Sequence, residues 1–467
     1  MISFLPKKIS DTAIYLYLGA LTAVTLVFLR HAMPWFFIAM GIAWVAGFFL
    51  LTNYCGKQWD KLSERKFITQ VVLTSIGLRV AWVIFSYYFY LAQTGAPFEY
   101  GAADSIVYFD QASWLATLKL GEVFDQLFIS TPSIADSGYV FYLSLIHRIF
   151  GPSIFIARLL KAIWGAATVY LLYKLAKRNL GEEVARMSAV MACFMPNLII
   201  YCGLHLKETE MIFLIVAFLE RTDYLIRSRK YNVFTIGIPV LLALSLFTFR
   251  TVLGGAAIFS FVTSLVFTRS NVIGKKKRVM LISWGVLAVL TFTGGTIINE
   301  VQSTWEERGE NQTNKRATQT LKGNKWAKYA TGSVMAPMIF VLPFPTMIDI
   351  EDQQNQEVLS GGNYVRNFLG AFVLIALFSS IFITKNWRDL SLIGSFVIAY
   401  LGVISSSGYA NSERFLLPGI PVLLIMAAYG ITLLNSKNYQ FVKLWYYVVP
   451  IMAFAWAFFK VGSRGLF

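Results

Sequence analysis

The segment YVFYLSLIHRIF, at Tyr139–Phe150, decides how the rest of the chain is threaded, because it is apolar yet too short to cross a bilayer. Its polar side chains Ser144, His147 and Arg148 recur at the spacing of one helix face. This pattern predicts an amphipathic helix that lies on a membrane surface. If the segment were a span, every later loop would change sides, so we count it as a surface helix.

The composition of the whole chain is that of a membrane protein. The chain has 467 residues, of which 57% are hydrophobic and 14% charged, and its mean hydropathy is +0.59. These values exclude the soluble globular classes. The net charge is +16, but the basic residues form short clusters between apolar runs, as cytoplasmic loops do. Topology therefore explains the basic character, and we expect no nucleic-acid partner.

Apolar runs of sufficient length predict about 13 transmembrane helices, and hence an all-α polytopic membrane protein. A cytoplasmic N-terminus, with Lys7 and Lys8 inside, places every short basic loop on the same face of the membrane. Four segments are expected along the chain. They are an N-terminal transmembrane hairpin at 1–66, a transmembrane module at 67–297 that includes an outer loop at 93–150, a long outer loop at 298–366, and C-terminal transmembrane helices at 367–467.

The first outer loop is rich in acids and contains GAADSIVYFDQASWL at Gly101–Leu115. This stretch predicts a short helix on which Asp104, Tyr108 and Gln111 share one face. Asp136 lies near the other end of the loop. A carboxylate held partly out of water can serve as a general base. The ordinary alternatives are a helix N-cap for Asp104, an interfacial aromatic anchor for Tyr108 and a turn residue for Asp136.

Further polar residues are predicted on the same outer face, in LHLKETE, LFTFRTVLGG and ERFLLPGIP. They are His205, Lys207, Glu208, Arg250 and Arg414. An arginine at a membrane boundary is costly and is a functional hypothesis by default, and fixed cations suit a phosphate group. Each residue has an ordinary alternative. Lys207 could reach to the membrane interface, Glu208 could cap a helix and Arg250 could lie in a solvated turn. Arg414 could serve as a positional anchor, and His205 could be a solvated side chain.

In this order along the chain, the motifs resemble those of the GT-C membrane glycosyltransferases, in particular the protein O-mannosyltransferase and lipid A aminoarabinose transferase branch. The resemblance is clear over Phe67–Ile226 and includes the late ERFLLPGIP element. The matching positions are Asp104, Tyr108 and Ala112 in the first outer loop, Phe150-Gly151 after the surface helix and Arg158 in the next span. Where many relatives have a second acid, Asp104 is followed by Ser105.

The resemblance implies transfer of a sugar from a polyprenyl-phosphate-linked donor to an acceptor hydroxyl of a glycan, lipid or protein. The reaction would take place at the outer face of the membrane, the periplasmic face of a bacterial inner membrane. No cofactor is expected, although a divalent metal is compatible with the carboxylates. The expected roles are catalysis by Asp104 and Asp136, binding of the donor phosphate by Arg414, Lys207 and Arg250, and substrate binding by Tyr108, His205 and Glu208.

Two other classes of protein remain open. An O-antigen-type polysaccharide polymerase or ligase would also have many spans, outward-facing arginines and a long outer loop such as 298–366, but could dispense with the first loop. A lipid or polysaccharide transporter or flippase would show repeats, broken helices and charges near mid-membrane. We find no internal repeat and few ionisable residues deep inside any span, which favours an enzyme.

Overall fold

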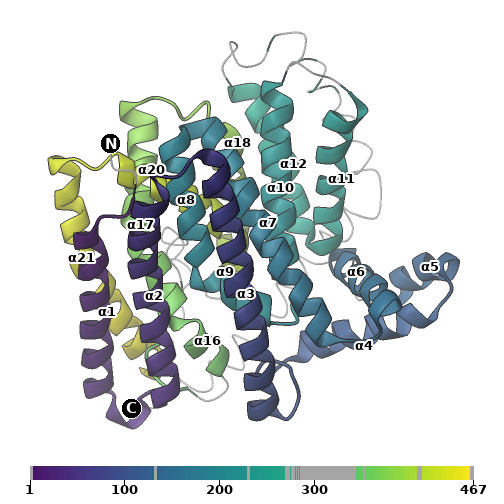
Figure 1. The fold of residues 1–467 in the computed structure, drawn as a ribbon, viewed down its shortest axis with the longest axis horizontal. Helices are drawn as coiled ribbons and strands as arrows, with labels where there is room; N and C mark the ends of the chain where they lie inside the picture. Colours follow the sequence, from purple (N-terminus) through teal and green to yellow (C-terminus); the bar gives the residue numbers. More distant parts are fainter. Residues whose placement is uncertain are drawn as a thin grey trace.

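The computed structural model describes residues 4–130, 134–228, 232–268, 343–350, 353–406 and 413–462, with isolated positions between 274 and 283. Every regular element in these ranges is a helix, as the sequence predicted. Figure 1 shows the long helices side by side, with α4 (Ala103–Thr117), α5 (Leu120–Ser130) and α6 (Ile134–Phe150) grouped at one end of the bundle.

Seven of the described helices are long and apolar enough to cross a membrane, or eight if a bent pair counts as one span. The chain is thus an integral membrane protein, but the predicted number of about 13 spans is not confirmed in the described part of the chain. One predicted span, Val279–Ile297, lies outside the described residues except for isolated positions at its start. The seven spans are α1 (Lys7–Val27), α2 (Trp35–Trp59), α3 (Glu64–Thr94), α7 (Ile154–Leu180), α17 (Ser360–Phe378) with the π-helical η4 (Ser379–Ile383), α19 (Glu413–Leu416) with η6 (Leu417–Gly419) and α20 (Ile420–Thr432), and α21 (Ser436–Gly462).

The other helices are shorter or more polar, and α6 is among them, as expected for a helix that does not span the membrane; its place on the membrane surface stays a prediction. Besides α4, α5 and α6, they are η1 (Leu29–His31), α8 (Glu182–Phe194), α9 (Pro196–Ile200), η2 (Tyr201–Gly203), α10 (Glu208–Arg227), α11 (Val233–Phe249), α12 (Thr251–Phe267), α16 (Gln354–Val358) and α18 (Ser391–Ser406).

The bent pair owes its break to a proline and its stability to a buried arginine. α8 ends before Pro196, and the chain turns by 54° between α8 and the α9–η2 segment. Because Pro196 has no N–H, the carbonyl of Ala192 loses its helical partner. Arg79 of α3, which is 1% exposed, donates to the carbonyls of Ala192 (3.2 Å) and Cys193 (3.4 Å). An arginine deep in a span therefore supports a broken helix here.

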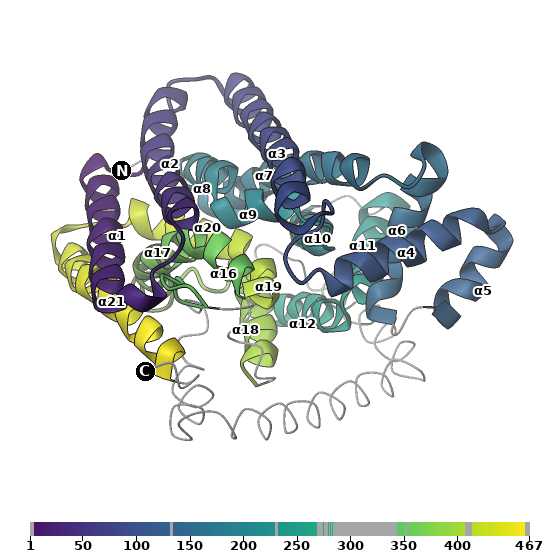
Figure 2. The same cartoon turned by 90° about the horizontal axis from the view of Figure 1, so that it is seen from below.

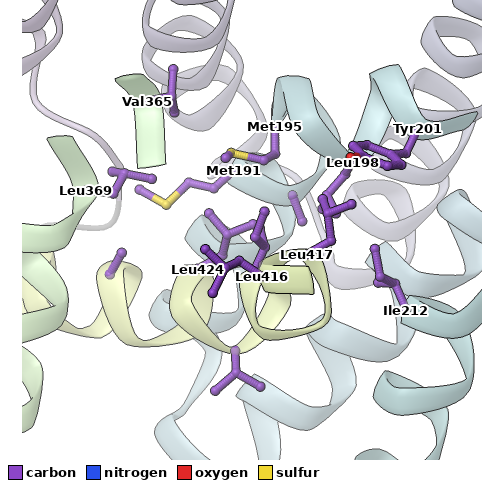
Figure 3. Packing of buried hydrophobic residues seen from close by; sticks show 14 of the residues in the cluster. Met191, Met195, Leu198, Tyr201, Ile212, Val365, Leu369, Leu416, Leu417 and Leu424 are labelled. Carbon is purple, nitrogen blue, oxygen red and sulfur yellow. The ribbon is translucent and has the colours of Figure 1, made fainter. Parts of the chain in front are cut away.

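Buried apolar side chains fill the centre of the bundle between the broken span and the last helices (Figure 3). The packing is close because α20 carries Gly430 against the backbone of α17, where an added Cβ would collide with the Phe372 carbonyl. This contact fixes α20 against α17, and α20 follows α19 in the chain. The labelled side chains are Met191, Met195, Leu198, Tyr201, Ile212, Val365, Leu369, Leu416, Leu417 and Leu424.

The basic loops that the sequence places on one face do meet at one end of the bundle. Arg186 of α8 donates to the carbonyls of Asp60 (3.2 Å) and Leu62 (2.9 Å) between α2 and α3. Arg227, at the end of α10, donates to the carbonyl of Asp389 before α18 (3.1 Å). The relative sides of these loops thus agree with the predicted threading, while the assignment of this end to the cytoplasm stays a prediction.

The loops that the sequence places on the outer face meet at the opposite end, which Figure 2 views directly. The backbone N–H of Asp349 donates to the carbonyl of His31 (2.8 Å), and Asn355 of α16 donates to the carbonyl of Tyr100 just before α4 (2.7 Å). Residues from the first and last thirds of the chain are therefore neighbours at this end, where the candidate site lies.

Candidate functional site

Seven of the eight residues predicted for the site come together at the end of the bundle where α4 lies along α6 (Figure 2). Five separate parts of the chain supply them, and the contacts form two adjoining sets. The contributing parts are α4, α6, the start of α10 with the residue before it, the junction of α11 and α12, and α19.

Asp104 is held by an arginine from the far end of the chain. It is in the first turn of α4, and Ala102, which precedes the helix, is the cap residue and makes no side-chain cap bond. The N-cap alternative for Asp104 is therefore wrong. Nη1 of Arg414 donates instead to Oδ2 of Asp104. The Asp104 side chain remains 54% exposed, against 23% for Arg414, so this acid is oriented yet open to solvent.

Glu208 lies behind Arg414 and ties it to a second arginine. Its Oε1 accepts from Nε of Arg414 and lies 3.5 Å from Nη2 of Arg250. The Glu208 side chain is fully buried, and a buried carboxylate is tolerated only when it is paired. Its place at the first position of α10 adds the favourable field of the helix N-terminus. One carboxylate thus holds two guanidinium groups next to each other.

Arg250 separates α11 from α12 and is buried, so the alternative of a solvated turn is wrong. Nη1 of Arg250 donates to the hydroxyl of Tyr400 (3.3 Å), and its guanidinium carbon is 4.5 Å from the centre of the Phe415 ring. The Tyr400 hydroxyl in turn donates to the carbonyl of Phe415 (2.6 Å). The sequence did not point to Tyr400; Phe415 could have been suspected as the neighbour of Arg414.

The second set of contacts joins Asp136 to Lys207 and Tyr108. Asp136 is in the first turn of α6, so the turn alternative is wrong. Its Oδ1 accepts from the hydroxyl of Tyr108 (2.7 Å) and from the ammonium of Lys207. Lys207 also donates to the carbonyl of Ala135 (2.8 Å) and is only 4% exposed. The Lys207 side chain does not reach out to the membrane interface, so that alternative is wrong.

The protonation of this set follows from its burial and its charges. Burial lowers the pKa of Lys207 to about 8, although the charge of Asp136 acts against the shift. Burial by itself would raise the pKa of Asp136, but the Lys207 ammonium and the Tyr108 hydroxyl hold it below its usual range. Burial, reinforced by the Asp136 carboxylate, raises the pKa of Tyr108. At neutral pH the set contains a cation, an anion and a neutral phenol.

The two sets adjoin, because Lys207 and Glu208 are consecutive and the charge of Arg414 acts on Tyr108. Together they contain three carboxylates and three basic groups, so the site is close to neutral without a substrate. In the described part of the chain, no group of three or more histidine, cysteine, aspartate or glutamate side chains could hold a metal ion. The carboxylates of the site each face a basic side chain instead.

His205 is the predicted site residue that lies apart from these contacts. It is fully buried, and its ring is surrounded by those of Phe98 (6.1 Å), Phe109 (5.9 Å) and Tyr139 (6.4 Å). Burial, followed by the nearby cation of Lys161, holds the pKa of His205 well below its usual range. The ring is therefore neutral and buried, so the solvated alternative is wrong, and substrate binding by His205 stays a prediction.

The comparison with known families agrees with the class that the sequence indicated. The family described as dolichyl-phosphate-mannose-protein mannosyltransferase matches residues 138–293. This segment covers most of α6 and contains Lys207, Glu208 and Arg250. The match confirms the predicted resemblance to GT-C membrane glycosyltransferases over this third of the chain.

Solved structures of an archaeal enzyme show a general likeness to the chain. The oligosaccharyltransferase of Archaeoglobus fulgidus in complex with zinc and sulfate is 12% identical, with 84% of this chain and 53% of that chain covered and a TM-score of 0.45. The same organism's oligosaccharyltransferase AglB, in complex with an inhibitory peptide and a dolichol-phosphate, is 11% identical, with 86% and 56% covered and a TM-score of 0.45. The chain spans about half the length of these structures. No curated protein matches the chain.

Proposed function

We propose that the protein transfers a sugar from a polyprenyl-phosphate-linked donor to an acceptor hydroxyl, on a glycan, lipid or protein. The site would face the side of the membrane opposite the basic loops, which we take to be the periplasmic side of a bacterial inner membrane. One observation carries the proposal. Arg414 links the exposed Asp104 to the buried Glu208 and Arg250, so an acid open to solvent lies beside cations that suit a phosphate.

Exposure distinguishes the three acids of the site. The Asp104 side chain is 54% exposed, against 25% for Asp136 and 0% for Glu208. Only a carboxylate that an incoming hydroxyl can reach can act as its base. We therefore assign the base to Asp104, whereas Glu208 holds the two arginines. Asp136 orients Lys207 and Tyr108, which refines the catalytic role that the sequence suggested for it.

The proposed reaction is a single displacement. The acceptor oxygen forms a bond to the anomeric carbon while its proton passes to Asp104. The bond from the anomeric carbon to the phosphate oxygen breaks, and the electron pair leaves with the polyprenyl phosphate. Arg414, Arg250 and Lys207 would stabilise the negative charge that develops on this leaving group, and the arginine fork suits phosphate oxygens.

The alternatives make different use of the same residues. A polymerase or ligase that takes lipid pyrophosphate oligosaccharides would rest on Arg250 and Arg414 and would not need Asp104. A transporter would need none of them for turnover, because it forms no bond. Asp104 therefore separates the proposed transferase from both alternatives, and Arg250 and Arg414 separate the two alternatives from each other.

The test is reconstitution of the purified protein in lipid with radiolabelled polyprenyl phosphate sugars and candidate acceptors. Asp104→Asn should lower transfer by roughly 10²- to 10⁴-fold, the usual contribution of a general base. The variant should stay folded, because asparagine keeps an oxygen for Arg414 and an exposed ion pair contributes only about 0–1 kcal/mol. Asp110→Asn is the matched control, since Asp110 is an exposed acid on the same helix.

Transfer that is lost in Asp104→Asn and kept in Asp110→Asn would support the proposal and identify the sugar. Equal turnover of wild type and Asp104→Asn would remove Asp104 as the base. Joining of lipid pyrophosphate oligosaccharides without any transfer from monosaccharide donors would establish the ligase or polymerase instead.

A further inference from the structure

We infer that Glu99, Ser105 and Arg158 form a bracket that positions the carboxylate of Asp104 for the transfer, an inference that rests on the proposed function. None of the three is in contact with the cations that would bind the donor phosphate. They act through the backbone of α4, which carries Asp104 in its first turn. They are therefore positioning residues and not catalytic ones.

The first turn of α4 is fixed by a hydrogen bond to the preceding loop in place of a side-chain N-cap. Ala102 offers no side-chain oxygen to the free N–H groups at the start of the helix. The hydroxyl of Ser105, next to Asp104, instead donates to Oε1 of Glu99 in the preceding loop. Ser105 is fully buried and Glu99 is 5% exposed, so water does not compete for this bond.

Arg158 attaches this loop to a membrane span. Its Nη2 donates to the carbonyl of Pro97 (2.6 Å) and lies 3.8 Å from Oε2 of Glu99. The Arg158 side chain is fully buried at the start of the long helix α7, where it forms an ion pair with Glu99. A buried charge that loses its partner is strongly unfavourable. The loop before α4 is thus held at two points by one guanidinium.

The other end of α4 is held separately, by α6. The hydroxyl of Ser113 lies 3.1 Å from Nδ1 of His147, and Arg148 donates to the carbonyls of Leu115 (3.1 Å) and Leu118 (2.7 Å). These contacts keep α4 in place when the bracket is weakened. Loss of the bracket is therefore expected to loosen the first turn and leave the rest of the helix where it is.

A loosened first turn would affect the rate more than the affinity for the donor. The reacting groups must lie within a few tenths of an ångström of their productive geometry, and a misplacement of about 1 Å can cost about 10²-fold in rate. Arg414, Arg250 and Glu208 form their own contacts without the bracket. Donor binding is thus expected to survive a change that moves Asp104.

The experiment compares Ser105→Ala, Glu99→Gln and the control Ser113→Ala in the reconstituted full-length protein. Ser105→Ala removes the bond to Glu99 with a residue that favours a helix. It should lower kcat about 10- to 100-fold with an unchanged apparent KM for the polyprenyl phosphate sugar. Glu99→Gln keeps an oxygen that can accept from Ser105 but leaves the buried Arg158 without its carboxylate, so it should lower kcat at least as far as Ser105→Ala does. Ser113→Ala breaks a similar contact at the far end of α4 and should leave kcat near that of wild type.

Hydrogen exchange of the backbone amides of α4 gives a readout that does not depend on activity. Ser105→Ala should speed exchange in the first turn of α4 and not in its second half, and Ser113→Ala should do the reverse. Wild-type kcat and exchange in Ser105→Ala would overturn the bracket while leaving the proposed function intact. Equal losses of kcat in Ser105→Ala and Ser113→Ala, or a rise in donor KM that matches the fall in kcat, would also overturn it. If wild type shows no transfer but exchange changes as expected, the proposed function fails and the bracket stands as a structural feature.

Discussion

Lys207 makes the proposed donor site sensitive to pH in the alkaline range. Burial lowers the pKa of its ammonium from 10.5 to about 8, so the charge is lost as the pH rises through that value. About nine-tenths of the lysine would be charged at pH 7 and about one-tenth at pH 9, by the usual titration relation. If the ammonium binds the donor phosphate, kcat/KM for the donor should fall about tenfold over this interval, because this quantity reports the free enzyme.

The assay is the initial rate of transfer at subsaturating donor from pH 6.5 to 9.5, for wild type and Lys207→Arg. Arginine keeps its charge over the whole range, so the descending limb should disappear in this variant. Lys119→Arg is the control, because Lys119 is exposed on the first outer loop, and its profile should match that of wild type. A limb near pH 8 that persists in Lys207→Arg would refute the reasoning, as would a flat profile in wild type.

Deprotonation of Lys207 would not unfold the protein, so unfolding caused by this group cannot explain a fall in the transfer rate between pH 7 and pH 9. Between the pKa of about 8 in the folded protein and the ordinary lysine value, the unfolded chain binds more protons at Lys207. For this group alone, stability therefore rises with pH in that window. A thermal melt at pH 9 that matches the one at pH 7 would separate the loss of donor binding from denaturation.

Two further predictions concern the site and the topology. Arg414→Ala should raise the apparent KM for the donor by roughly 10- to 100-fold, the range for lost hydrogen bonds to a charged group, with a smaller change for the acceptor; an unaltered donor KM would contradict its phosphate role. A reporter fused at Gly121, in α5, should report the outer compartment, and a cytoplasmic signal there would overturn the threading.

Much of the local structure could be predicted from the sequence. The spacing of Asp104, Tyr108 and Gln111 predicted a helix, and α4 is one. The short apolar segment Tyr139–Phe150 was predicted as a helix that is too short to span, and it forms most of α6, while its place on the membrane surface stays a prediction. These successes rest on periodicity and length, which a chain expresses locally. Boundaries were less accurate, since α6 already begins at Ile134 and includes Asp136.

By itself, the sequence determined that the chain is helical and lies in a membrane, and which polar residues lie near the ends of its helices. Hydropathy and helix period fix these properties, because each depends on neighbours a few positions away. Only the tertiary structure decided which charges meet. Asp104 and Arg414 are separated by 310 positions, and no local pattern records that pairing. Likewise His205 is two positions from Lys207 but turns its ring into an aromatic cluster, because the packing of distant helices sets the environment of each side chain.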